Sequence, residues 1–367
     1  MHANTFDARR KAMNKRATLA LLLSVGIVTP AWAQDECDPS NPLKSVIAVY
    51  SNRHDTVSTQ FLTWDIYLMD PEDLDEHGYM SVWRHLPGPG GDWAPAVSPD
   101  GKGRIVFDSN RNREAGQPFN TSQLFLMKAR ADDPEQRLLT RGSSATWSPD
   151  GKSIAFHASA SGAGLPINGN PGAATSDSAI FVAKVGDLLE GEPAEQITHP
   201  EGGQVDDDAD WSAVGEKIAF LRKKGVDTDS AEIYVINADG TGLTRLTTNT
   251  EEERSPAWSP DGQRIAFSCR TGTQALEICI MNADGTGVVK VTNNTVADLS
   301  PHWSADGTKI VFQRPVTNPL PGQGQQTWIM DADGSVQEGK QLTAPPGTHS
   351  FPAWGEIKCA GQHDEDD

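Results

Sequence analysis

The sequence predicts an all-β protein, a six-bladed β-propeller built from four-stranded antiparallel blades. The first observation is a repeated phrase, Trp-Ser-Pro-Asp-Gly followed after two residues by Ile-Ala-Phe, which occurs twice in full and elsewhere in looser form. The second is its period, because the marker residue that opens each copy returns every 45 to 64 residues. Such a period is typical of propellers and solenoids. The markers are Val97, Trp147, Trp211, Trp258, Trp303 and Trp354.

The repeat over residues 253–292 contains the four strands of one blade. Short apolar segments alternate with turn sequences, and we expect them to pair as antiparallel strands. These segments are residues 257–259, 265–269, 276–281 and 288–292. In the first turn, Pro260 fixes φ, Asp261 can bond its own backbone and Gly262 accepts a positive φ. Four such strands make one propeller blade.

The two ends of the chain complement each other. The last marker, Trp354, has no second, third or fourth strand after it. Residues 45–53 and 65–69 have the pattern of second and third strands that lack a first. We therefore expect the C-terminal strand to join the N-terminal blade, which closes a ring of six blades without an open edge. The column of Trp residues is expected to pack between blades rather than to bind a ligand.

The N-terminal residues 1–33 have the features of a secretory signal peptide. Lys15 and Arg16 precede an apolar run over residues 17–28, and cleavage is predicted after Ala33. Met1 and Met13 are both candidate starts. The prediction places the protein in the periplasm or outside the cell, with the propeller over residues 34–361 and an acidic tail over residues 362–367.

The charge balance is strongly acidic. The chain has 31 Lys and Arg residues against 50 Asp and Glu residues, a net charge of −19. Such a surface repels nucleic acid and anionic membrane, and it favours cations or basic partners, although solubility alone also explains it. Beyond the predicted signal peptide there is no long apolar run. We expect a monomer that does not insert into a membrane.

Four cysteines in an exported protein predict two disulfides. Cys37 lies just before the first predicted strand and Cys359 just after the last, so a bridge between them would join the chain ends. Cys269 and Cys279 flank a short hairpin loop. Three connectivities are possible, and the positions favour Cys37–Cys359 with Cys269–Cys279.

The repeat resembles that of a known family. The pattern Pro-x-Trp-Ser-Pro-Asp-Gly-x-x-Ile-Ala-Phe, then Ile-Tyr-x-Met/Ile-Asn-Ala-Asp-Gly-Thr-Gly, then Leu-Thr, is similar to the WD40-like repeats of the TolB propeller over about residues 45–357. TolB also has an α/β domain before its propeller, and about a dozen residues separate the predicted cleavage site from the first strand here. The resemblance is therefore to the propeller alone. It implies protein binding at the cell envelope, without the contacts made through the α/β domain.

Strand polarity predicts two different faces. The Ser-Pro-Asp-Gly and Ala-Asp-Gly-Thr turns share one face and are uniform. The opposite face has the long connections between second and third strands, at residues 110–122, 158–178, 223–230 and 314–326. Irregular loops on a rigid scaffold commonly bind ligands, although they can also be tolerated insertions.

The same face has a predicted ring of acidic residues at the channel mouth. The residue five positions before each marker leads into an innermost strand, and four of these six residues are acidic. The ring positions are Asp92, Gly142, Asp206, Glu253, Asp298 and His349, and Asp207 and Asp208 follow Asp206. We predict that Asp92, Asp206, Asp207, Glu253, Asp298 and His349 bind a basic segment, and that Asp206, Glu253 and Asp298 suit Ca²⁺. The alternative is that these carboxylates cap turns.

No catalytic residue is predicted. Gly151-Lys152-Ser153 lacks the upstream glycine of a phosphate loop, and neither a G-x-S-x-G nor an H-E-x-x-H motif occurs. The histidines lie at non-equivalent repeat positions. The prediction is a non-catalytic scaffold that binds a protein or peptide. The alternative is a propeller enzyme, a metal-dependent glycan lyase or hydrolase with its site at the channel mouth.

Overall fold

We describe a computed structural model of the chain. The residues described all belong to the compact unit Cys37–Asp367. They are residues 43–51, 65–75, 80–86, 91–111, 122–129, 136–159, 178–224, 231–249, 251–270, 272, 275–316, 324–335, 338–343 and 348–358.

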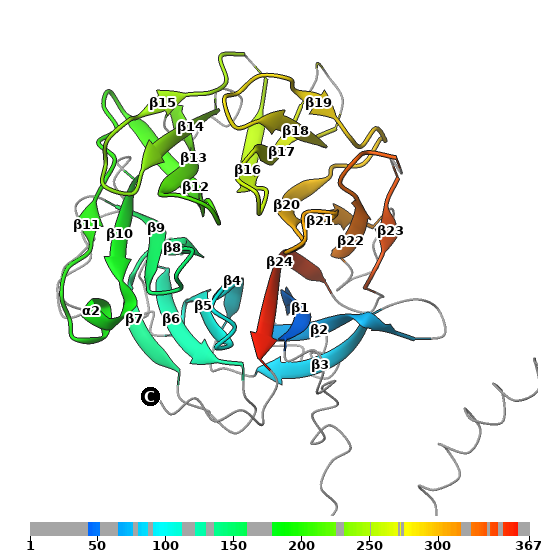
Figure 1. Ribbon diagram of the computed structural model, residues 1–367, viewed down its shortest axis with the longest axis horizontal. Coiled ribbons are helices and arrows are strands. Elements are labelled where there is room, and N and C mark those ends of the chain that lie inside the picture. Colours follow the sequence, from blue (N-terminus) through cyan, green and yellow to red (C-terminus); the bar gives the residue numbers. More distant parts are fainter. Residues whose placement is uncertain are drawn as a thin grey trace, which may run out of the picture. The chain divides into compact units, whose positions relative to one another are not determined.

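The described residues form six four-stranded antiparallel sheets arranged as a ring (Figure 1). From the inside outward, blade 1 consists of β24 (His349–Lys358), β1 (Leu43–Ser51), β2 (Asp65–Leu74) and β3 (Met80–Leu86). Blade 2 consists of β4 (Asp92–Val97), β5 (Arg104–Ser109), β6 (Gln123–Lys128) and β7 (Arg137–Arg141). Blade 3 consists of β8 (Ser143–Trp147), β9 (Ser153–Ser159), β10 (Ser178–Lys184) and β11 (Glu195–Gln196), with the short helix α2 (Val185–Leu189) after β10.

The other three blades follow the same order. Blade 4 consists of β12 (Gln204–Trp211), β13 (Lys217–Lys224), β14 (Glu232–Asn237) and β15 (Thr244–Arg245). Blade 5 consists of β16 (Glu253–Trp258), β17 (Arg264–Cys269), β18 (Glu277–Asn282) and β19 (Val289–Lys290). Blade 6 consists of β20 (Leu299–Trp303), β21 (Lys309–Pro315), β22 (Gln325–Asp331) and β23 (Lys340–Gln341). The predicted all-β, six-bladed propeller is confirmed.

The predicted closure of the ring is also confirmed. The C-terminal strand β24 is the innermost strand of blade 1 and pairs antiparallel with β1. The pairing extends from Leu43 opposite Lys358 to Ser51 opposite His349. The ends of the chain therefore close the ring by backbone hydrogen bonds.

The repeated phrase has a local structural reason in four of the six blades. In blade 3 the Ser148 hydroxyl donates to Asp150 Oδ1 at 2.7 Å and accepts the N–H of Ser153 at 2.9 Å. Gly151 has a φ of +66°, which a glycine adopts without strain. The Ser–Asp contact recurs in blades 2, 5 and 6, so these residues fix the tight turn between the first two strands.

The Trp residues pack between blades, as predicted. Trp147 is 5% exposed and lies in a core with Val106 and Leu124 of the preceding blade. Its indole N–H donates to the carbonyl of Ala96 at 3.0 Å. Trp303 makes the same bond to Ala257 of its preceding blade. The Trp column therefore stabilises blade-to-blade contacts.

The innermost strands are longer than the sequence pattern indicates. β16 begins at Glu253, four residues before the predicted start, because Glu253 and Arg254 pair with Cys269 and Ser268. A register shift between Arg254 and Ala257 then interrupts the ladder. This bulge breaks the period-2 alternation, so a pattern-based prediction misses the first half of the strand. No helix among the described residues is long and apolar enough to cross a membrane.

Gly355→Ala is expected to destabilise the protein by about 1–3 kcal/mol, the usual cost of overpacking. A Cβ at Gly355 of β24 would lie 2.4 Å from Val97 Cβ of blade 2, which is too close for two carbon atoms. Urea unfolding measures the loss. Gly186→Ala is the matched control, because nothing lies within 4 Å of its new Cβ. Equal stability of the two variants would contradict this account of the contact between blades 1 and 2.

Candidate binding site at the channel mouth

The predicted ring positions lie at the ends of the innermost strands, which surround the middle of the ring (Figure 1). Asp206 in β12 is opposite Arg222 near the end of β13, so the ring is on the face of the connections between second and third strands. One of the six ring positions is Gly142, which has no side chain, and the side chains at the other five are all buried. The exposed fractions are 1% for Asp92, 0% for Asp206, 2% for Glu253, 0% for Asp298 and 0% for His349.

In three alternate blades an arginine of the second strand, or just beyond it, neutralises the ring carboxylate. In blade 4, Arg222 Nε lies 2.6 Å from Asp206 Oδ1 and Nη2 lies 2.8 Å from Oδ2. Arg314 makes the same two contacts with Asp298 at the same distances. In blade 2, Arg111 Nη2 lies 2.7 Å from both oxygens of Asp92. Burial nevertheless raises the pKa of Asp92 against these hydrogen bonds.

Each of these arginines also lies over two aromatic rings of its own blade. Arg222 lies 5.0 Å from the ring centre of Tyr234 and 5.6 Å from that of Phe220. The equivalent pairs are Phe312 and Trp328 for Arg314, and Phe107 and Phe125 for Arg111. This arrangement, in which carboxylate, guanidinium and aromatic rings form one buried unit, was not predicted from the sequence. The sequence feature that could have predicted this arrangement is an arginine two or four residues after the Phe of the second strand.

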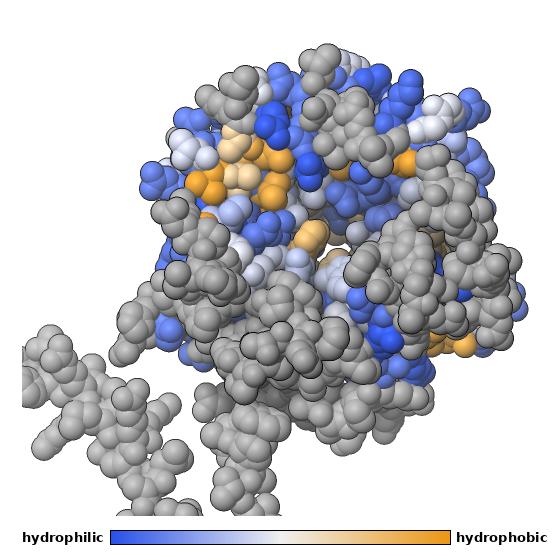
Figure 2. All heavy atoms as spheres, turned by 180° about the vertical axis from the view of Figure 1, so that it is seen from behind, coloured by the Kyte–Doolittle hydropathy of each residue, from blue (hydrophilic) through white to orange (hydrophobic). Residues whose placement is uncertain are grey.

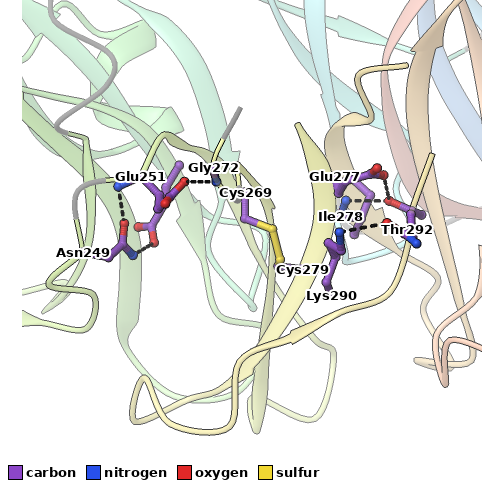
Figure 3. Close-up of a disulfide and its surroundings, with 11 residues drawn as sticks. Asn249, Glu251, Cys269, Gly272, Glu277, Ile278, Cys279, Lys290 and Thr292 are labelled. Atoms are coloured by element: carbon purple, nitrogen blue, oxygen red, sulfur yellow. Dashed lines mark hydrogen bonds between the residues drawn. A yellow bond between two sulfur atoms is a disulfide. The ribbon is translucent and has the colours of Figure 1, made fainter. Parts of the chain in front are cut away.

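Blade 5 has a disulfide where blades 4 and 6 have the arginine. Cys269 is opposite Glu253, and the predicted bond from Cys269 to Cys279 is confirmed (Figure 3). Glu253 instead accepts hydrogen bonds from Thr247 Oγ1 and Asn249 Nδ2, both at 2.6 Å. Burial raises the pKa of Glu253 to about 7. The other predicted pair, Cys37–Cys359, lies outside the described residues.

Six non-glycine residues with positive φ occupy one equivalent position, two residues after each ring position. Their φ values lie between +47° and +52°, a left-handed conformation that costs about 1–3 kcal/mol per residue. They are Ala94, Ser144, Asp208, Ser255, Ser300 and Phe351. Each innermost strand shifts register here, which marks a β-bulge that re-aims the side chain.

Asp208 shows where the bulged side chains point. It accepts a hydrogen bond from Ser255 Oγ of blade 5 at 3.2 Å. It also interacts electrostatically with His157 of blade 3 and with Asp108 of blade 2. Because blade 3 separates blades 2 and 4 along the ring, the interaction of Asp208 with Asp108 joins two blades that are not neighbours. We call the group Asp108, His157, Asp207 and Asp208 the acidic mouth.

Asp108, in the acidic mouth, is a buried carboxylate that accepts hydrogen bonds from hydroxyl and amide donors. It is 1% exposed and accepts hydrogen bonds from Ser143 Oγ and, at 3.0 Å, from the N–H of Ser144. Burial raises the pKa of Asp108 to about 7, and the charge of Asp208 adds to the rise. Among the described residues, no lysine or arginine forms an ion pair with Asp108.

Two polar atoms of the acidic mouth are buried and have no hydrogen-bond partner among the described residues: Asp207 Oδ1 and His157 Nδ1. The other oxygen of Asp207 lies 2.5 Å from Lys223 Nζ. Burial raises the pKa of Asp207 to about 6, with Asp208 adding to the rise and Lys223 opposing it. Burial lowers the pKa of His157, so its imidazole is neutral at pH 7. These atoms are available to a ligand or to water.

The wall opposite Asp208 is aromatic. In a ring of six blades, blade 1 faces blade 4, and the bulge residue of blade 1 is Phe351. Phe351 is 39% exposed, and its ring centre lies 5.6 Å from that of Tyr50. From the side opposite to Figure 1, the coloured surface is mostly hydrophilic, with a larger apolar patch at the upper left and smaller apolar spots elsewhere (Figure 2). The mouth therefore combines carboxylates on one side with an aromatic surface on the other.

The three residues predicted to hold Ca²⁺ do not meet. Asp206, Glu253 and Asp298 belong to three different blades. Asp206 and Asp298 each pair with an arginine of their own blade, whereas Glu253 accepts from Thr247 and Asn249, which follow β15 of blade 4. Within the ranges that the structure describes, no three His, Cys, Asp or Glu side chains are grouped closely enough to hold a metal ion. A calcium site at the mouth stays a prediction.

Comparisons with known proteins agree with the fold. The family described as TolB beta propeller domain matches residues 174–358, just over half of the chain. Among solved structures, TolB from Acinetobacter baumannii has 19% identity and a TM-score of 0.59, over 84% of this chain and 66% of that chain. A chain of the nidogen/laminin complex has 10% identity and a TM-score of 0.57, over 86% of this chain and 100% of its own. No curated protein matches the sequence.

These likenesses have a limited meaning. At identities below 20% they show the shared fold alone. The chain also spans just under two thirds of the length of the Acinetobacter protein. The propeller therefore supports a protein-binding scaffold in general, and the ligand has to be argued from the mouth itself.

Proposed function

Since this chain belongs to the TolB β-propeller family, we propose that it is an exported, non-catalytic scaffold that binds a basic segment of a protein or peptide at its channel mouth. The observation that carries the proposal is the electrostatic interaction of Asp108 in blade 2 with Asp208 in blade 4, two blades that are not neighbours in the ring. Two carboxylates from different blades concentrate negative potential there, and neither has an ion-pair partner among the described residues. A lysine or arginine side chain would supply the missing cation.

The aromatic wall suits the same ligand. Lysine and arginine have an apolar stem and a charged end. In the proposed complex, the stem lies against Phe351 while the charged end approaches Asp108 and Asp208.

The proposal includes export. Residues 1–33 serve as the signal peptide, cleaved after Ala33, with the propeller over residues 34–361 and the tail over residues 362–367. The Cys269–Cys279 disulfide and the TolB relatives support a location in the periplasm or outside the cell, because disulfides persist in oxidising compartments.

Calorimetry with two synthetic peptides tests the function. One peptide has a central run of lysines, and the other has glutamines at the same positions. The wild-type protein should prefer the lysine peptide, and the variant Asp108→Asn/Asp208→Asn should lose at least about tenfold in affinity for it. The matched control Glu190→Gln/Glu192→Gln removes two exposed charges elsewhere and should bind as the wild type does. Equal binding by all three proteins would overturn the proposal.

Binding of the lysine peptide is expected to strengthen as the pH rises from 5 to 8. The pKa values of Asp108, about 7, and Asp207, about 6, are raised, so both carboxyls are largely neutral at pH 5 and charged at pH 8. Asp208 and Lys223 face these groups, and both also interact with His157, whose pKa burial lowers. The affinity should change on the order of tenfold, with protons released on binding. Titrations in buffers of different ionisation enthalpy measure that release, and a pH-independent affinity would contradict the assignment.

The alternative function is a propeller enzyme acting on a glycan at the same mouth. The observation that favours it is the neutral imidazole of His157 beside Asp208, near a carboxyl of raised pKa, which resembles a general acid–base pair. Turnover of oligosaccharides that disappears in His157→Gln would support the enzyme. Peptide binding that is unchanged in His157→Gln, without turnover in either protein, would support the scaffold.

A further inference from the structure

A cavity of about 210 Å³ lies in blade 4, beside the acidic mouth. It is bounded by the end of β13 and the first residues of β14. The charged and aromatic residues that line it are Arg222, Lys223, Lys224, Glu232, Tyr234 and Arg245. Drug-sized ligands occupy about 300–1,000 Å³, so this cavity suits a smaller molecule, of the size of an amino acid.

The cavity is basic, although the chain has a net charge of −19. Three of its four cations are paired, because Arg222 contacts Asp206, Lys223 contacts Asp207 and Arg245 contacts Glu232. Lys224 is exposed and forms no ion pair with any residue that the structure describes. One positive charge at the rim is therefore left for an anionic group.

Glu232 lines the same cavity and has a buried acceptor. Its side chain is 7% exposed, and its Oε1 lies 2.6 Å from Arg245 Nη2. Its other oxygen, Oε2, is buried and receives no hydrogen bond within the described part of the chain. A buried carboxylate oxygen without a donor is costly, so a donor group from outside the chain would stabilise it.

In the neighbouring blade 5 the equivalent glutamate has both carboxylate oxygens hydrogen-bonded. Glu277 is the equivalent first residue of the third strand in blade 5. Its Oε2 accepts Thr292 Oγ1 at 2.7 Å, and its Oε1 accepts the N–H of Asn294 at 2.6 Å (Figure 3 shows Glu277 and Thr292). In blade 4 the equivalent threonine, Thr247, donates to Glu253 instead. Both carboxylate oxygens of Glu277 therefore receive hydrogen bonds, whereas Oε2 of Glu232 receives none within the described part of the chain.

We propose that this cavity binds a small molecule with a carboxylate beside a hydrogen-bond donor, an α-amino or α-hydroxy acid. The carboxylate pairs with Lys224 at the rim. The amino or hydroxyl group donates to Glu232 Oε2, and an apolar side chain lies against Tyr234. The site is separate from the proposed peptide site, and none of the residues that carry this proposal belongs to the acidic mouth.

Calorimetry with four compounds of one shape tests the proposal. They are leucine, its α-hydroxy analogue leucic acid, leucinamide, which lacks the carboxylate, and isocaproate, which lacks the donor. Leucine or leucic acid should bind, and the better of the two identifies the donor as an amine or a hydroxyl. Leucinamide and isocaproate should bind at least about tenfold more weakly, because each lacks one of the two contacts.

Variants of the two contact residues locate the binding. Lys224→Met and Glu232→Gln should each lower the affinity at least about tenfold. Lys217→Met, at the opposite end of β13, is the matched control and should bind as the wild type does. Since Lys224 is exposed, its variant should fold even if Glu232→Gln does not. The proposal is wrong if none of the four compounds binds at millimolar concentration, or if Lys224→Met binds them as well as the wild type does. In either case the cavity is not their binding site and holds water alone. Asp108→Asn/Asp208→Asn should leave this binding unchanged, so the two proposals fail separately.

Discussion

Arg222→Met is expected to destabilise the protein by about 3–5 kcal/mol, the cost of leaving a buried charge without its partner. Asp206 is 0% exposed, and both of its oxygens contact the Arg222 guanidinium. Methionine fills part of the volume but supplies no donor. The variant would therefore keep a carboxylate inside blade 4 with neither water nor a cation to stabilise it.

Urea unfolding of four proteins tests this expectation. The double variant Asp206→Leu/Arg222→Met should recover most of the stability that Arg222→Met loses, because an apolar pair replaces the whole ion pair. Lys152→Met is the matched surface control. Its side chain is 78% exposed and lies 3.9 Å from Asp150, so its loss should be too small to measure. A loss below about 1 kcal/mol in Arg222→Met would contradict the buried ion pair.

The architecture could be predicted because it depends on local and repeated features. The phrase around Trp258 contains the residues that form its own turn. In a closed ring the unpaired strand at Trp354 can pair only with the N-terminal blade, which lacks a first strand. The structure confirms both, with β24 beside β1. The ends of the innermost strands were predicted less well, since each bulge breaks the alternation on which the prediction depends.

The candidate site was predicted only in part, for reasons that are not local. The pattern placed Asp206 at the start of an innermost strand but did not show that Arg222, sixteen residues later, would neutralise it. That contact depends on the register between β12 and β13. Asp108 and Asp208 come from blades 2 and 4, and they interact electrostatically because the ring brings these blades around one channel. The bulge position has no glycine in any blade, so the sequence contains no signal for its positive φ.

Trp147→Ala is expected to cost about 3–5 kcal/mol, as for other large aromatic residues removed from a core. Trp147 is 5% exposed and fills the space between blades 2 and 3, against Val106 and Leu124. Arg104 lies over its ring, 5.0 Å from the ring centre. Alanine would leave a cavity at this contact, and the carbonyl of Ala96 would lose its donor.

Phenylalanine variants separate the packing from the hydrogen bond. Trp147→Phe keeps most of the apolar area but removes the 3.0 Å bond to Ala96, a loss of about 1 kcal/mol beyond the change in packing. Trp258 packs in the equivalent place, but its indole nitrogen has no partner among the described residues. Trp258→Phe should therefore cost less than Trp147→Phe by about that amount. Equal losses in thermal or urea unfolding would show that packing alone joins the blades and that the bond to Ala96 contributes nothing net. A larger loss at Trp147 would mean that this tryptophan contributes a directional contact as well as volume, a contact that Trp303 also makes and Trp258 does not.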